Sequence, residues 1–300
     1  MASERVRAES ARQGADMKFG RGMAAAWLIV VLAAGCSPSG AGVADTPGGA
    51  PTTASTGGVP SSAADDLSRR YESGLSALRN ADTVTYSSTS AVQVASNYSQ
   101  RESRVSVDAR RRIATTRLRV HADLGGKRTD TTVLVVNTTD ATFLSIPSWT
   151  GSRKGKWMRV TSADLESLQV PLELADPTTL PPSLEHFEGT GVRSSRAIEG
   201  TIDALSGIRL FGLTAALKDP GVAASVAGRV PAVVTVDPAS GAILKVEVVG
   251  EGHTVHATPE SLPPGTLEQF LSAASALVTI EQVGQPLTIS LPSSEDVLEG

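Results

Sequence analysis

The stretch TVTYSSTSAVQV, residues 83–94, decides the fold class of this chain. Apolar side chains alternate in it with polar or small ones, with Val84 and Tyr86 near its start and Val92 and Val94 at its end. Alternation with a period of two is typical of antiparallel strands that have one buried and one solvated face. We therefore predict an antiparallel sheet. The same period returns in the next segments at Val105, Val107, Leu118 and Val120.

Further strands are expected before residue 161 and after residue 229. Gly125 and Gly126 predict a turn before the strand at residues 131–137, and Thr139-Asp140 predicts the hairpin turn that follows this strand. Asp237, Pro238 and Gly241 lie between two apolar runs and give a strong hairpin signal, because Pro and Gly suit the turn positions. The expected strands are residues 131–137, 142–146, 156–160, 230–236, 243–249, 253–257 and 287–291.

Helical spacing appears in a few segments only. Residues 65–80 begin with two aspartates that suit a helix N-terminus, and Leu67, Tyr71, Leu75 and Leu78 recur at helical intervals. Helices are also predicted at residues 163–174, 210–226, with an interruption near Asp219-Pro220-Gly221, and 266–277. One helix, many antiparallel strands and a few later helices predict an α+β fold.

The only cysteine, Cys36, follows a segment typical of a signal peptide. Lys18 and Arg21 precede an uncharged apolar run of about a dozen residues, which is too short to span a membrane. The order Leu32-Ala33-Ala34-Gly35-Cys36 resembles the lipobox of bacterial lipoproteins, in which the cysteine thiol is diacylglycerated and the chain is cut just before it. We predict a signal peptide over residues 1–35, with Met17 as an alternative start.

Composition divides the rest of the chain in two. Residues 36–64 consist almost entirely of Ser, Thr, Pro, Gly and Ala, and they predict a flexible tether with a reach of roughly 30 Å. Residues 65–300 are long enough for one domain. Five of the 27 basic and three of the 31 acidic residues lie before residue 36, which leaves a net charge of −6 and no basis for a nucleic-acid partner.

Three short stretches carry a resemblance to a known family. They are GKWMRV at residues 155–160, VPAVVTVD at residues 230–237 with Gly241, and GQPLTI at residues 284–289 with Pro292. Together with the order of elements, they resemble the LolA/LolB-like bacterial lipoproteins, and among these the actinobacterial LppX/LprG-type branch. The resemblance implies a curved antiparallel half-barrel with helices that cover its concave face.

The resemblance also implies a function. It predicts a hydrophobic cavity that receives a lipid or acyl chain, in a monomer held by Cys36 at the extracytoplasmic face of the cell membrane. A packed core, with a role in protein interaction or sensing, is the alternative, and the protein partner is unknown. The expected lining residues are Val84, Tyr86, Val92, Val94, Leu118, Val133, Val135, Phe143 and Trp157.

Catalytic and metal-binding patterns are weak. His253 and His256 would face opposite sides of a strand, which does not suit two ligands of one metal. The sequence has no Gly-x-Ser-x-Gly elbow and no phosphate loop. We therefore expect no enzyme, no metal and no cofactor.

Basic residues concentrate in one region of the predicted sheet. Two interpretations remain: outward charges that keep the sheet soluble, or a face that docks on anionic lipids. The residues are Arg101, Arg104, Arg110, Arg111, Arg112, Arg117, Arg119, Lys127 and Arg128.

Overall fold

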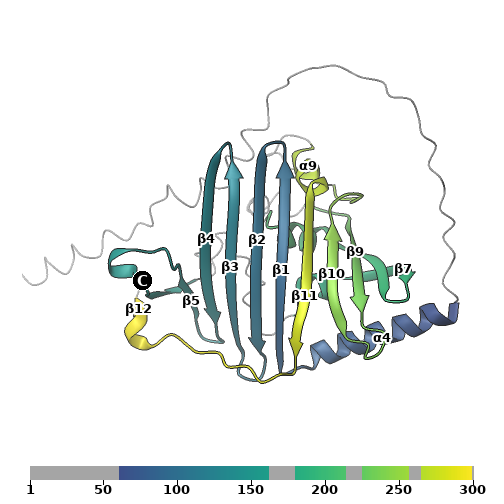
Figure 1. Cartoon of the computed structure of the whole chain (residues 1–300), viewed down its shortest axis with the longest axis horizontal. Coiled ribbons are helices and arrows are strands. Elements are labelled where there is room, and N and C mark those ends of the chain that lie inside the picture. The colour runs from purple at the N-terminus through teal and green to yellow at the C-terminus, as the bar shows by residue number, and fades with distance from the viewer. Residues whose placement is uncertain (1–60, 162–179, 214–224, 257–264, 299–300) are drawn as a thin grey trace, which may run out of the picture.

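A computed structural model describes residues 61–161, 180–213, 225–256 and 265–298. Within these ranges the chain forms one large open sheet of 12 strands with a few helices (Figure 1). This confirms the α+β class and the antiparallel sheet. The predicted signal peptide, Cys36 and nearly all of the tether lie outside the described residues, as do the helices expected at 163–174 and over most of 210–226.

The sheet has the strand order β12-β6-β5-β4-β3-β2-β1-β11-β10-β9-β8-β7. Every pair of described strands is antiparallel except β12 with β6. The strands in the first half of the chain are β1 Thr83–Val94, β2 Asn97–Asp108, β3 Ile113–Leu124, β4 Lys127–Asn137, β5 Thr142–Ser145 and β6 Trp157–Val160. Those in the second half are β7 Glu188–Ser194, β8 Ala197–Asp203, β9 Arg229–Val236, β10 Ile243–Val249, β11 Ala274–Val283 and β12 Val297–Leu298.

Local turn chemistry fixes the predicted hairpins. Gly125 and Gly126 have φ angles of 60° and 81°, which a two-residue turn between β3 and β4 requires. Between β9 and β10, the Asp237 carboxylate accepts hydrogen bonds from the N–H groups of Ala239 and Ser240, at 2.7 and 3.3 Å. These bonds lower the pKa of Asp237. Both hairpins were expected from the sequence.

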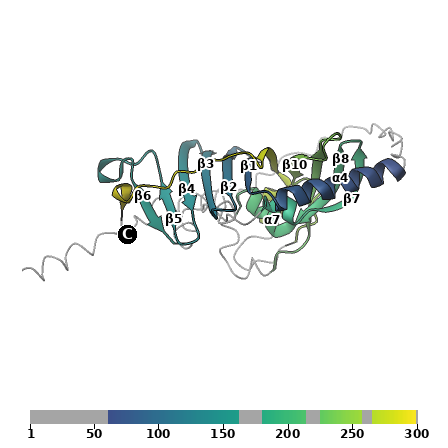
Figure 2. The same cartoon turned by 90° about the horizontal axis from the view of Figure 1, so that it is seen from below.

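Within the described ranges four helices accompany the sheet: α4 Ser61–Arg79, α6 Pro182–Glu185, α7 Ala204–Leu210 and α9 Thr266–Ser272. Helix α4 packs against β7, β9 and β10, α6 against α7 and β10, and α7 against β8 and β9. Helices α4 and α7 lie on one side of the sheet (Figure 2). Helix α9 lies at the ends of β1 and β11 and contacts β1. Two single-turn helices, η1 Gly151–Arg153 and η4 Ser294–Asp296, complete the described elements.

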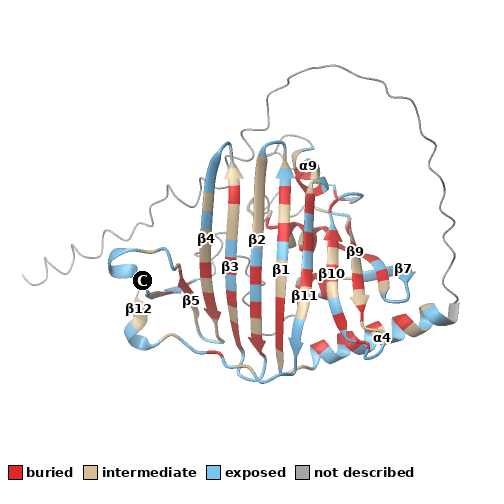
Figure 3. Cartoon of the chain, viewed as in Figure 1, coloured by how far each residue is buried: buried red, intermediate tan, exposed pale blue. Residues whose placement is uncertain are grey.

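The sheet therefore has a helix-side face, which carries α4, α6 and α7, and an opposite face. Burial alternates along the strands, as the period of two requires (Figure 3). In β9 the even-numbered residues are buried and the odd-numbered ones are half-buried. The main core joins the helix-side residues of β7–β11, β1 and β2 to Leu67, Tyr71, Leu75 and Leu78 of α4.

Some expected elements are wrong. Helix α4 begins at Ser61 instead of residue 65, so it includes the end of the predicted tether. The segment expected as one helix over 266–277 ends as a helix at Ser272 and continues as β11. Residues 253–257 form only a single bridge, between His256 and Ala227, and the last strand is β12 instead of residues 287–291.

Candidate functional site

The helix-side face of β1–β6 carries most of the predicted lining residues. Val84, Tyr86 and Val92 of β1 are buried in the main core, and Val94 is half-buried against it. Strand register then places Leu118, Val133 and Val135 on the same face, through the pairs Ser103 with Leu118, Leu118 with Val133 and Thr116 with Val135. Directly paired residues in antiparallel strands point to the same side.

Leu118, Val133 and Val135 belong to a second apolar cluster on this face. The residues that pack around its edge are half-buried: Val120, Ile146, Trp149 and Leu298. The strong contacts of the described helices are with β1 and β7–β10, so this cluster lies beside the helix-packed core. We call it the β3–β6 cluster; its members are Leu118, Val133, Val135, Leu144, Met158 and Val160.

Phe143 and Trp157 lie elsewhere. Phe143 pairs with Val136, and Trp157 has the same parity as Arg159, the partner of Phe143. Both side chains therefore point to the opposite face, where they pack against the buried cluster of Ile113, Val136 and Ile289. The strands β5 and β6 are too short for the sequence to show which of their side chains point to the helix side. In the structure Leu144 and Met158, which were not among the predicted lining residues, point to that side.

Polar side chains interrupt the helix-side face in the middle of β1–β3. Ser90 of β1 lies directly opposite Arg101 of β2, and Arg101 lies opposite Val120 of β3. Ser90 is buried, as are Ser103 and Thr116, which share this face. In β1 two serines thus separate apolar residues at the two ends of the strand, and in β2 polar residues occupy the helix-side positions before Val105. Together these polar residues form a band whose members are Ser88, Ser90, Ser99, Arg101, Ser103 and Thr116.

Arg101 is the unusual member of this band. Its Nη1 atom is shielded from solvent and has no hydrogen-bond partner. Burial lowers the pKa of Arg101 to about 10, so the guanidinium group stays charged at neutral pH. The backbone of Gly212, just after α7, lies so close that a Cβ on this residue would collide with the guanidinium group. Arg101 is thus a half-buried residue with a shielded Nη1 atom and no counter-charge among the described residues, and an unpaired charge in such a place is costly in a folded protein.

The sequence contained a signal for this position. Arg101 is an even number of residues before Val105 and Val107, and the period of two places all three on one face. Its charge instead suggested an outward position. The other buried polar atoms without a hydrogen-bond partner are Tyr71 Oη, Ser183 Oγ and Asp203 Oδ2.

Tyr71 and Asp203 lie among the helices. Burial raises the pKa of Tyr71 to about 12, with a further contribution from Glu72. Its ring meets that of Phe187 edge-on, with centroids 5.7 Å apart. Burial alone would raise the pKa of Asp203, but hydrogen bonds from Ser206 and the nearby His186 lower it overall. Asp203 therefore caps α7 as a carboxylate, with its Oδ1 atom 3.0 Å from Ser206 N.

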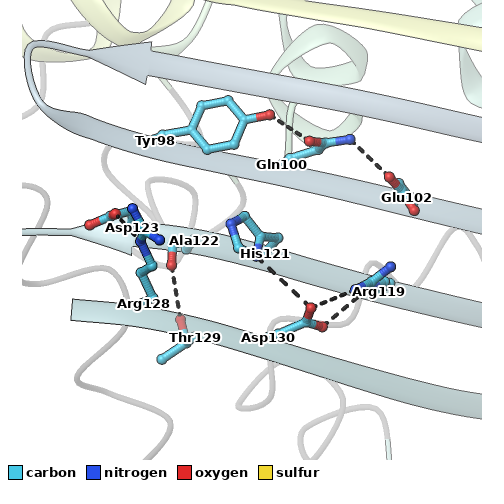
Figure 4. A network of polar contacts seen from close by, with 10 residues as sticks. All are labelled: Tyr98, Gln100, Glu102, Arg119, His121, Ala122, Asp123, Arg128, Thr129 and Asp130. Atoms are coloured by element: carbon cyan, nitrogen blue, oxygen red, sulfur yellow. Dashed lines mark hydrogen bonds and ion pairs between the residues drawn. The ribbon is translucent and has the colours of Figure 1, made fainter. Parts of the chain in front are cut away.

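Four of the remaining arginines, Arg104, Arg117, Arg119 and Arg128, lie on the opposite face of the sheet, where carboxylates lie among them. Arg119 makes two hydrogen bonds to Asp130, at 2.6 and 3.1 Å, and these lower the pKa of Asp130 (Figure 4). Arg128 pairs with Asp123 at 2.9 Å, on the same opposite face of the sheet (Figure 4). Carboxylates thus accompany much of the positive charge. Further ion pairs join Arg104 to Glu281, Arg110 to Asp82 and Arg111 to Asp108.

The histidines have local roles. His253 Nε2 lies 3.2 Å from the Glu268 carbonyl oxygen and 3.1 Å from Ser272 Oγ, while Nδ1 accepts a hydrogen bond from Val255 N. His253 therefore joins the segment after β10 to α9. In the part of the chain that the structure describes, no group of three or more His, Cys, Asp or Glu residues could hold a metal ion.

Comparisons with known proteins give matches in structure alone. No protein-family model matches the sequence, and no curated protein matches it significantly. The structure is similar to that of LprF from Mycobacterium bovis, with a TM-score of 0.41 and 12% identity, over 77% of this chain and 98% of LprF. It is also similar to LppX from Mycobacterium tuberculosis, with a TM-score of 0.36 and 16% identity, over 75% of this chain and 99% of LppX.

A DUF1329 family protein from Desulfovibrio piger matches more weakly, with a TM-score of 0.29 and 8% identity, over 75% of this chain and 95% of that protein. The first two matches are mycobacterial lipoproteins of the kind that the sequence resembles. With TM-scores below 0.5, they carry nothing about ligand or activity. Among the described residues, no helix is both long and apolar enough to cross a membrane.

Proposed function

We propose that this protein is a membrane-anchored lipoprotein that binds or carries lipids or acyl chains at the outer face of the cytoplasmic membrane. The β3–β6 cluster is the observation that carries the proposal. It is a buried apolar cluster on the helix-side face, beside the core on which the described helices pack. In the proposed arrangement the sheet curves as a half-barrel around the ligand, and the acyl chain lies along this cluster.

The energetics suit an acyl chain. Each buried methylene group contributes about 0.8 kcal/mol, so ten of them contribute about 8 kcal/mol before the cost of association. A surface of Leu, Val and Met side chains needs no directed polar contact to hold such a chain. Six residues of this kind form the cluster, and each is at most 8% exposed, so an acyl chain would take the place of the atoms that now cover them.

The proposed anchor places the domain near its ligand. Acylation of Cys36 would hold the chain at the membrane, and a tether with a reach of roughly 30 Å would let the domain touch the bilayer surface. Two signals are generally needed for stable anchoring, and a diacylglyceryl group supplies two acyl chains.

Native mass spectrometry of the mature chain tests this proposal. The protein is residues 36–300 with Cys36→Ser, produced in a lipid-containing bacterial host and then extracted with organic solvent. The proposal predicts a non-covalent species of lipid mass that organic solvent removes. A protein that is free of lipid and stays so with added fatty acid contradicts it. Recovery of a stable protein partner in its place would favour the interaction or sensing role.

A further inference from the structure

We propose that Arg101 binds the anionic group, a carboxylate or phosphate, of an amphiphilic ligand whose acyl chain lies on the β3–β6 cluster. This inference rests on the proposed lipid-binding function and adds the chemical class of the head group.

The position of Arg101 supports this role. It lies at the centre of the strand order, on β2, with β3 and the apolar cluster on one side and β1 on the other. Leu118, a member of the cluster, lies on the neighbouring strand and pairs with Ser103, two residues from Arg101. A ligand with its head group at Arg101 can therefore place its acyl chain on the cluster while both parts stay on the helix-side face.

Arg101 also lacks the partner that other arginines of this sheet have. Arg104, Arg119 and Arg128 pair with carboxylates at 2.6–2.9 Å, and all three lie on the opposite face. Among the described residues Arg101 has no such carboxylate, and its Nη1 donor is unsatisfied. An enclosed guanidinium group that keeps its charge is stabilised by an anion, because the anion replaces the lost hydration.

The surroundings of Arg101 fit a carboxylate or a phosphate. The planar guanidinium group donates paired hydrogen bonds that match two oxygens of either anion. Three serines lie on the same face of the sheet as Arg101: Ser99 and Ser103, two residues before and after it on β2, and Ser90, directly opposite it on β1. Gly212 lets the backbone after α7 pass close to the guanidinium group, where any larger residue would collide with it. Apolar side chains with a few convergent polar groups are typical of small-molecule sites.

The test compares ligands that share one acyl chain and differ in the head group. The mature chain with Cys36→Ser is delipidated, and its affinity is measured for oleate, lysophosphatidate with an oleoyl chain, and oleyl alcohol. Acetate and inorganic phosphate are the free anions. The protein variants are Arg101→Gln, Arg101→Lys and, as a matched control, Arg117→Gln. Arg117 is an exposed arginine on the opposite face of β3 and has no ion pair within the described residues.

The expected result is a preference of about 10- to 100-fold for one or both anionic amphiphiles over oleyl alcohol, as charge-assisted hydrogen bonds provide. Arg101→Gln should remove the preference, Arg101→Lys should retain part of it, and Arg117→Gln should leave it unchanged. The ratio between oleate and lysophosphatidate then tells carboxylate from phosphate.

Three results would overturn the inference. Equal affinity for oleate, lysophosphatidate and oleyl alcohol would leave lipid binding intact and remove the head-group role. A preference that survives Arg101→Gln in a folded protein would place the anion elsewhere. If free phosphate or acetate binds but none of the three amphiphiles does, the proposed lipid-binding function fails, and the inference fails with it because Arg101 then binds a free anion.

Discussion

Arg101→Met should stabilise the ligand-free protein, because it removes an enclosed charge that has no partner. Burial lowers the pKa of Arg101 from its usual value to about 10. Each unit is worth about 1.4 kcal/mol, so the charged form is destabilised by about 3 kcal/mol in the folded state. The folded-state pKa lies below the unfolded one, so this penalty is complete at neutral pH and declines only as the pH rises through about 10. Methionine is unbranched like the stem of arginine, shorter, and uncharged.

Urea denaturation at pH 7 measures the effect. With the delipidated mature chain, followed by far-UV circular dichroism, we expect Arg101→Met to raise the free energy of unfolding by about 1–3 kcal/mol. The matched variant Arg117→Met should change it by no more than about 0.5 kcal/mol, as is usual for exposed positions. Both variants should keep the m-value of the parent protein, because the surface exposed on unfolding stays the same.

A loss of stability would refute this reasoning. If Arg101→Met lowers the free energy of unfolding by more than about 1 kcal/mol, the guanidinium group has an internal partner that compensates its burial. The anion-binding role would lose its energetic basis at the same time. If an anionic lipid is present, the parent protein should have the higher free energy of unfolding, because the ligand stabilises the parent protein and not the variant.

Three further predictions concern the anchor and the helices. Cys36→Ala should release the protein from membranes, as cell fractionation would detect; an unchanged, uncleaved membrane-bound form would contradict the anchor. Gly74→Ala in α4 should cost about 1–3 kcal/mol in urea denaturation, because the new Cβ collides with the Gly241 carbonyl oxygen, whereas Ser73→Ala on the exposed side should cost nothing. Equal effects of the two substitutions would contradict the close contact of α4 with the β9–β10 turn. Asp203→Ala should cost about 1 kcal/mol by removing the cap of α7. Since the folded-state pKa of Asp203 is lowered, this loss should be present above pH 4 and vanish as the pH falls below that pKa; a pH-independent difference would contradict the ionised cap.

Local patterns predicted the central sheet well. In β1–β4 the period of two is long, and Gly125 and Gly126 mark the turn between β3 and β4, so the sequence alone indicates these strands. The two earlier turns hold Ala95 and Arg112 at positive φ, which the sequence does not reveal. Residues 274–277 show the limit. Their apolar spacing fits a helix as well as a strand, and pairing with β1 and β10 selects the strand.

The site was less predictable than the sheet. Leu287 and Ile289 are apolar, yet they pack against the opposite face without forming a strand. Phe143 and Trp157 point away from the predicted lining because two four-residue strands carry too few alternations to fix their facing. Arg101 could be placed by its parity with Val105, but the absence of a partner depends on which side chains the fold brings near it. Contacts between residues that are distant in the sequence cannot be predicted from local patterns.

Photo-crosslinking tests the lipid-binding account most directly. The delipidated mature chain is loaded with a fatty acid that carries a diazirine near its methyl end, irradiated and digested, and the labelled peptides are sequenced by mass spectrometry. The account predicts labels on helix-side residues of the β3–β6 cluster, with Leu118, Val133, Leu144 and Met158 foremost. Labels confined to the opposite face, or labelling no stronger than in the presence of excess unlabelled fatty acid, would contradict it.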